Sequence, residues 1–92
     1  MKGFRHSCSE TYTNLPTQVI VSDSGNHRVQ VFDKYGRFLF KFGREGSADG
    51  LFKYPRGVAV DRHGNIVIGD SGNNRVQVLL CVVLKDALVV LL

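Results

Sequence analysis

Two sets of polar residues in this chain have types and spacing that could bind a ligand. Each set has an aspartate, an asparagine three residues later and an arginine two further on: Asp23, Asn26, Arg28 and Asp70, Asn73, Arg75. Arginines could neutralise phosphates, and amides could read base edges. A catalytic centre would have to be singular, however, and these sets recur. A structural interpretation is therefore favoured, in which Asp and Asn cap the turn backbone and Arg pairs with a carboxylate nearby.

The other reactive side chains form no catalytic or metal-binding pattern. His6, His27 and His63 lack the spacing of metal ligands, and no acidic pair brackets them as a catalytic base would require. Cys8 and Cys81 stand far apart, with no C-x-x-C pair that could form a zinc site such as a RING or B-box. We expect no enzyme activity in this chain, no cofactor, no metal and no small-molecule substrate.

The polar sets belong to a longer internal repeat. The segment 19–32 returns 47 residues later as 66–79, with eight of 14 positions identical. A period of this length is typical of a propeller, a solenoid or a repeat array.

Alternation of polar and apolar residues predicts that the repeats are all-β. The segment 28–33 has period two, and 37–42 places Phe38, Phe40 and Phe42 on one face. Asp33–Gly36 has the composition of a hairpin turn. Short strands joined by tight turns at this period match four-stranded propeller blades.

The strand pattern divides the chain into three parts. Residues 18–79 hold the repeats: 18–42 supply strands two to four of one blade, and 57–79 supply strands one to three of the next. Residues 1–17 and 80–92 depart from the repeat.

The ends and the composition give weaker indications. Residues 79–92 are apolar at 12 of 14 positions, but a membrane helix needs about 20 apolar residues, so we expect no membrane span. Without a secretory leader or paired cysteines, a reducing, cytoplasmic location is expected. The net charge of +4 permits an anionic partner without requiring one.

The repeats resemble a known family. The strings 57–78 and 23–43 are similar to the NHL repeat, and 46–55 resembles the inter-blade loop of tripartite-motif proteins with a C-terminal NHL propeller. The resemblance implies an incomplete NHL-type propeller, about one and a half blades of a six-bladed ring. In the tripartite-motif branch the propeller is joined to a RING with ubiquitin-ligase activity, and some members bind RNA.

The resemblance implies an interaction module that recognises a protein substrate or RNA for a tripartite-motif ubiquitin ligase. Such a ligase would act in ubiquitin-dependent protein degradation or post-transcriptional regulation. The alternative is a fragment of a lyase-like propeller, or of another NHL protein with no ligase link. A lyase of this kind needs metal-binding histidines in the central channel, and the expected channel strand, 57–61, has none.

The predicted binding site is the face where the second-to-third turns and the inter-blade connection emerge. His27 and Asn74 occupy equivalent turn tips, where side chains should face solvent, and Tyr54 is the aromatic residue that could stack on a base. Protein or RNA, single-stranded or structured, is the expected partner. The predicted site residues are Asn26, His27, Arg28, Tyr54, Arg56, Asn73, Asn74 and Arg75.

Overall fold

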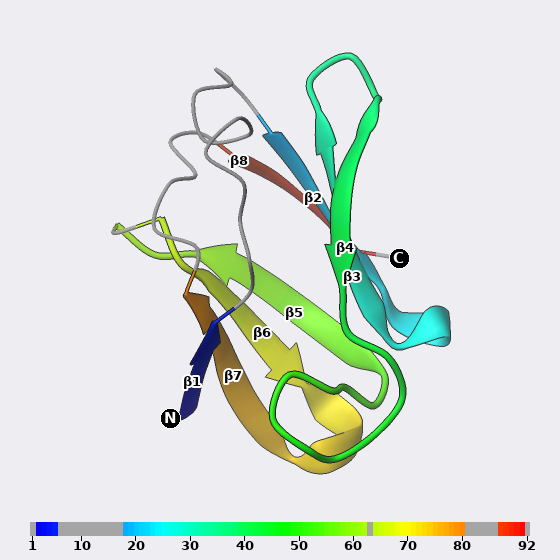
Figure 1. Cartoon of the computed structure of the whole chain (residues 1–92), viewed down its shortest axis with the longest axis vertical. Coiled ribbons are helices and arrows are strands. Elements are labelled where there is room, and N and C mark those ends of the chain that lie inside the picture. Colours follow the sequence, from blue (N-terminus) through cyan, green and yellow to red (C-terminus); the bar gives the residue numbers. More distant parts are fainter. Residues whose placement is uncertain (1, 6–17, 63, 81–86, 92) are drawn as a thin grey trace.

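The computed structural model describes residues 2–5, 18–62, 64–80 and 87–91, which form two four-stranded sheets (Figure 1). One sheet has the order β4-β3-β2-β8, with β2 (Gln18–Asp23), β3 (Arg28–Asp33), β4 (Phe38–Phe42) and β8 (Ala87–Leu91). The other has the order β1-β7-β6-β5, with β1 (Lys2–Arg5), β5 (Pro55–Val60), β6 (Ile66–Asp70) and β7 (Arg75–Leu80). The all-β prediction is confirmed, since the described helical segments are only two three-residue 3-10 turns.

Antiparallel hairpins make up the repeat part of both sheets. In each repeat a turn, η1 (Ser24–Asn26) or η2 (Ser71–Asn73), joins two strands. The β3–β4 hairpin closes at Asp33–Gly36, where the Gly36 N–H donates to the Asp33 carbonyl at 3.0 Å. Gly36 has a φ of 84°, a conformation that glycine adopts without steric cost.

The two strands outside the repeats pair in parallel. β8 runs beside β2, and β1 runs beside β7, whereas all other strand pairs are antiparallel. β8 thus takes the place of a first strand in the sheet of β2, and β1 that of a fourth strand in the sheet of β7. The predictions for His6, Cys8, His63 and Cys81 lie outside the described residues.

The core forms where alternating strand residues meet from both sheets. Burial follows period two in β2, β3 and β6, and in β3 this confirms the alternation predicted from the sequence. The buried apolar side chains are Ile20, Val29, Val31, Phe42, Phe52, Ile66, Ile68 and Leu79. Within the described ranges, no helix is long or apolar enough to cross a membrane.

The prediction that Phe38, Phe40 and Phe42 share one face is wrong. The β3–β4 register pairs Val31 with Phe40 but Phe32 with Phe38, which leaves one extra residue on β4. Such a bulge moves the following side chains to the opposite face of the sheet. Phe38 therefore lies against Phe32, with ring centroids 5.8 Å apart, and is 53% exposed.

The first strand of the second repeat begins earlier than predicted. We expected 57–61, but β5 starts at Pro55, which pairs with Asp70, and a register shift follows before Val58. Proline is tolerated as the first residue of a strand, where no ladder bond from its nitrogen is needed. The Pro55 carbonyl accepts a 2.9 Å hydrogen bond from the buried Ser22 hydroxyl, which connects the two sheets.

Candidate ligand-recognition face

Both repeat turns and the connection between the sheets lie at the lower end of Figure 1, and the β3–β4 turn lies at the top. Residues of η2 contact the connection directly: the Gly72 N–H donates to the Lys53 carbonyl at 2.7 Å. We call the predicted site residues at this end the turn face; they are Asn26, His27, Arg28, Tyr54, Arg56, Asn73, Asn74 and Arg75. The connection thus contacts both turns, through Lys53 at η2 and through Tyr54 at His27.

In the first repeat, the Asp23 carboxylate gathers three side-chain donors. It accepts from Arg28 Nε at 2.8 Å, from Asn26 Nδ2 at 3.1 and 3.2 Å and from Gln30 Nε2 at 3.3 Å. Burial opposes ionisation of Asp23, but these hydrogen bonds and the charge of Arg28 outweigh it and lower the pKa of the carboxyl. Asp23 is therefore a charged anchor for the Arg28 guanidinium.

In the second repeat the same cluster is more deeply buried and has one more partner. Asp70 is 0% exposed and accepts from Arg75 Nε at 2.8 Å, Asn73 Nδ2 at 2.9 Å and Gln77 Nε2 at 3.2 Å. Its second oxygen accepts from the Lys53 backbone N–H at 2.7 Å. Burial acts to raise the pKa of Asp70, but the hydrogen bonds prevail and lower it.

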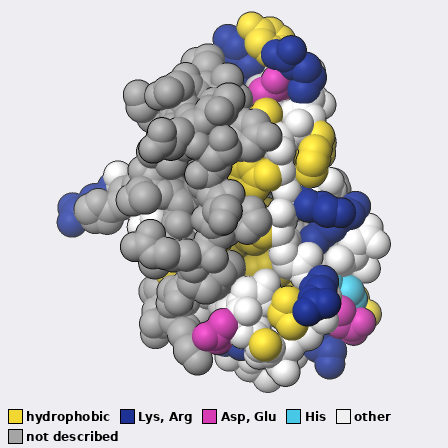
Figure 2. Space-filling model, viewed as in Figure 1, with side chains coloured by type: hydrophobic (Ala, Val, Ile, Leu, Met, Phe, Trp, Pro, Cys, Tyr) yellow, Lys and Arg dark blue, Asp and Glu magenta, His cyan; other side chains and the backbone are white. Residues whose placement is uncertain are grey.

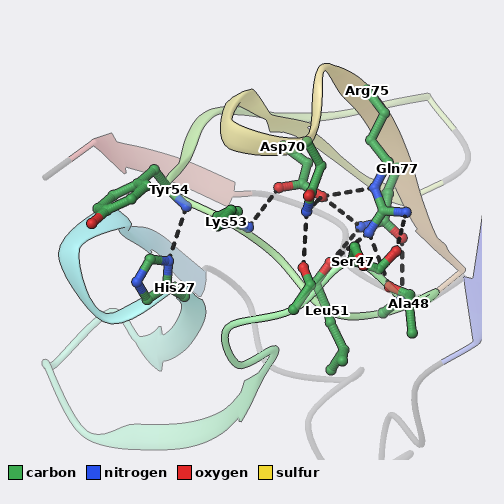
Figure 3. A network of polar contacts seen from close by, with 12 residues as sticks. His27, Ser47, Ala48, Leu51, Lys53, Tyr54, Asp70, Arg75 and Gln77 are labelled. Carbon is green, nitrogen blue, oxygen red and sulfur yellow. Dashed lines mark hydrogen bonds and ion pairs between the residues drawn. The ribbon is translucent and has the colours of Figure 1, made fainter.

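The second cluster also binds the connection between the sheets (Figure 3). Arg75 Nη1 donates to the Ser47 carbonyl at 2.8 Å, and Nη2 donates to the carbonyls of Ala48 and Leu51, both at 2.9 Å. Gln77 adds a 2.8 Å bond to the Leu51 carbonyl and accepts one from the Gly50 N–H at 3.0 Å. All nitrogens of the Arg75 guanidinium are therefore engaged within the chain.

The structural interpretation of the two polar sets is correct in one part and wrong in the other. Arg28 and Arg75 do pair with the nearby Asp23 and Asp70. Neither aspartate caps its turn backbone, however. The carboxylates accept from side chains instead, and Asp70 also accepts from the Lys53 N–H of the connection. They therefore hold the arginines in place more than they stabilise the turns.

His27 and Tyr54 form a contact between the first turn and the connection. The Tyr54 N–H donates to His27 Nδ1 at 3.0 Å, and the two rings meet edge to face at 4.4 Å. Since Nδ1 accepts, the neutral imidazole carries its hydrogen on Nε2, which lies 3.8 Å from a Glu45 carboxylate oxygen. Both His27 and Tyr54 have left-handed φ, 54° and 48°.

The two turn tips do not face solvent equally. Asn74 is exposed as predicted, but the His27 side chain is only 14% exposed, because Tyr54 covers it. Tyr54 itself remains 51% exposed, and Arg56, two residues later, is exposed. The turn face thus presents Asn26, Tyr54, Arg56 and Asn74 to solvent, with His27 behind the tyrosine.

The opposite end, around the Asp33–Gly36 turn, has its own exposed aromatic residue. Tyr35 is 72% exposed, with Lys34 Nζ and the Arg37 guanidinium carbon 5.2 and 5.4 Å from its ring centroid. Arg37 Nε also bonds Asp33 at 2.8 Å. Figure 2 shows basic side chains from the top to the bottom of the molecule, not gathered at one end. Charge alone therefore does not select the turn face.

Gln30 and Gln77 were not among the predicted site residues. Both recur at the same position of the repeat, in the string Arg-Val-Gln-Val, and both point polar groups at the aspartate of their cluster. Their recurrence on a strand was the available signal. Within the described residues, no three His, Cys, Asp or Glu side chains come together as a metal site.

Acid is expected to destabilise the chain through Asp70. Because its folded-state pKa lies below the ordinary 3.8, the carboxylate contributes stability above that value, and this contribution is lost as the pH falls through the folded-state pKa. Denaturant unfolding between pH 6 and about pH 3 should therefore show falling stability. In Asp70→Asn the free energy of unfolding should depend less steeply on pH. An unchanged pH dependence would contradict the assignment of this acid sensitivity to Asp70.

Comparisons with known proteins agree with this arrangement of repeats. The NHL repeat family model matches residues 18–32 and 52–79. The chain is similar to Protein brain tumor of Drosophila melanogaster, 44% identical over 69 residues, which are 74% of this chain and 7% of that protein. It is also similar to B-box type zinc finger protein ncl-1 of Caenorhabditis elegans, 48% identical over 50 residues, or 54% of this chain and 5% of that protein. The chain thus spans 7% or less of the length of these two relatives.

Proposed function

Because the chain belongs to the NHL-repeat proteins, we propose that it is a recognition module that binds single-stranded RNA through the turn face. The residues proposed to contact RNA are Tyr54, which would stack on a base, Arg56, which would neutralise a phosphate, and Asn74, which would read base edges. His27 lies behind Tyr54 and would hold that residue in place. Asn26 and Asn73 bond their aspartates and hold the turns, and Arg75 holds the connection.

The observation that carries this proposal is the fixed, exposed ring of Tyr54. Half of the residue is open to solvent, yet its backbone N–H is bonded to His27 and its φ is left-handed. A bulky residue in that conformation is held there by its surroundings, and such strain is concentrated at functional positions. A ring that is already fixed loses little entropy when a base stacks on it.

Replacing Tyr54 with alanine is expected to weaken RNA binding by about 1–3 kcal/mol, the usual loss for one stacked base. Arg56→Ala should weaken binding to all RNA sequences by a similar factor. It should also reduce the slope of log affinity against log salt concentration by about 1, the value for one phosphate contact. The measurement is the affinity for single-stranded oligonucleotides over a salt series.

Tyr35→Ala is the matched control, because Tyr35 is also an exposed tyrosine with cations beside it, at the opposite end of the molecule. It should bind RNA like the unmodified chain. If Tyr35→Ala loses affinity and Tyr54→Ala does not, the turn face is the wrong site.

A protein ligand is the second candidate, favoured by the acidic residues of the same connection. Glu45, beside His27, and Asp49 are both exposed and would repel phosphates. If Tyr54→Ala and Arg56→Ala leave RNA affinity unchanged while a protein target is still captured, protein recognition is the better account.

We also propose that recognition through this module serves a tripartite-motif ubiquitin ligase. The sequence resemblance supports this, as does a relative whose name includes a B-box zinc finger. The test is ubiquitin transfer by the full-length protein to a bound target, compared with a variant that lacks the repeats. Equal transfer by both would contradict it.

A further inference from the structure

The two repeats carry the same polar motif, but only one motif has a peptide segment bound to it. Asp70, Arg75 and Gln77 hold the connecting segment 46–53 by its backbone. Its recognised groups are five carbonyls, from Gly46, Ser47, Ala48, Leu51 and Lys53, and the N–H groups of Gly50 and Lys53. On the side of the bound segment, these hydrogen bonds use main-chain atoms throughout.

The motif of the first repeat has the same donors, but among the described residues they bond only to Asp23 and to no other segment. Among the described residues, Arg28 uses only Nε, toward Asp23, and both of its Nη groups lack an acceptor. Gln30 contacts only Asp23 with its side chain, and no backbone N–H reaches the carboxylate. The exposed fraction of the aspartate is correspondingly larger, 15% for the Asp23 side chain against 0% for Asp70.

Gly25 and Gly72 give independent evidence that a backbone segment can dock on the first motif. A Cβ on Gly72 would lie 2.6 Å from the Lys53 carbonyl oxygen, so glycine is required there by the backbone packed against it. A Cβ on Gly25, the equivalent residue, would meet nothing within 4 Å, and its φ is not left-handed. Glycine at 25 is therefore needed neither for space nor for conformation in this structure, but it would be needed if a backbone docked there.

We propose that Asp23, Gly25, Arg28 and Gln30 form a binding site for the backbone of a peptide loop from another NHL repeat. The loop has the pattern of Gly46–Lys53. Arg28 Nη1 and Nη2 and Gln30 Nε2 donate to its carbonyls, Asp23 accepts one of its N–H groups, and the Gly25 N–H donates to the following carbonyl. This site is separate from the RNA contacts proposed for Tyr54 and Arg56.

The test uses a synthetic peptide with the sequence of residues 44–54, titrated into the full chain and followed by NMR of the arginine side chains. The Arg28 guanidinium signals should move with saturation, while those of Arg75 stay in place. A peptide N-methylated at its Lys53 nitrogen keeps every side chain but loses the N–H for Asp23, and it should bind about tenfold more weakly.

Gly25→Ala is the decisive variant, because it should leave stability unchanged and block the peptide. Its matched partner Gly72→Ala should lower stability, since the Lys53 carbonyl lies in the way of the new methyl group. Arg28→Ala should weaken peptide binding about tenfold or more. Arg37→Ala, which breaks an equivalent 2.8 Å Arg–Asp pair at the opposite end, should bind the peptide normally.

Three results would overturn the proposal. The peptide could fail to shift the Arg28 signals at millimolar concentration, or Gly25→Ala could bind it as well as the unmodified chain does. Gly25→Ala could also remove RNA binding as strongly as Tyr54→Ala. That result would make the proposed peptide site, with Gly25 and Arg28, part of the RNA site. If Tyr54→Ala leaves RNA binding intact but the peptide still shifts the Arg28 signals, the proposed RNA function fails and the peptide site stands.

Discussion

The substitution Asp70→Asn is expected to lower the free energy of unfolding by about 3 kcal/mol, the lower end of the loss when a buried ion pair is left with one partner. The Asp70 carboxylate is 0% exposed and accepts from Lys53, Asn73, Arg75 and Gln77. An asparagine amide would turn an N–H₂ group toward these donors and leave the guanidinium uncompensated. The loss also releases the connection between the sheets.

Asp23→Asn provides the comparison within the same molecule. The local sequence is the same, but the Asp23 side chain is 15% exposed, the Arg28 side chain is 33% exposed and no connection is bound. Its loss should therefore be about 1 kcal/mol, as for a solvent-accessible pair. Chemical denaturation of both variants measures the difference. Equal losses would show that the bound connection does not strengthen the second cluster.

The second large effect is expected from Phe52→Ala, which should cost about 3–5 kcal/mol through the cavity it leaves in the core. Phe52 is 0% exposed and packs edge to face on Phe42, with ring centroids 6.0 Å apart. Its backbone also bonds Arg44 and Gly46, so the ring anchors the connection. Phe38→Ala is the control: Phe38 is 53% exposed, and its loss should cost about 1 kcal/mol or less. Similar values for the two variants would contradict the bulge assignment on β4.

The strands and turns of the repeats could be predicted because their causes are local. Period-two alternation in 28–33 determines which side chains face the core, and burial follows it. Asp33–Gly36 closes a hairpin because glycine accepts the positive φ that the turn requires. The shared location of the turns and the connection followed from the same pattern.

The predictions that the structure contradicts concern positions where one extra residue or one partner distant in the sequence changes the environment of a side chain. A single extra residue on β4 moved Phe38 to the other face, and an apolar stripe gives no sign of such a bulge. His27 was expected in solvent, but Tyr54, 27 residues away, covers it. The parallel pairings of β1 and β8 likewise join segments that share no repeat pattern.

By itself, the sequence determined that the repeats are all-β with two copies of an Asp-Ser-Gly-Asn turn, because alternation and recurrence are properties of neighbouring residues. It could not distinguish Asp23 from Asp70, which stand in nearly identical strings. Only the tertiary structure made one cluster a buried anchor and left the other open. The reason is that the segment 46–53 can pack against one of them, and burial and hydrogen bonding depend on that packing.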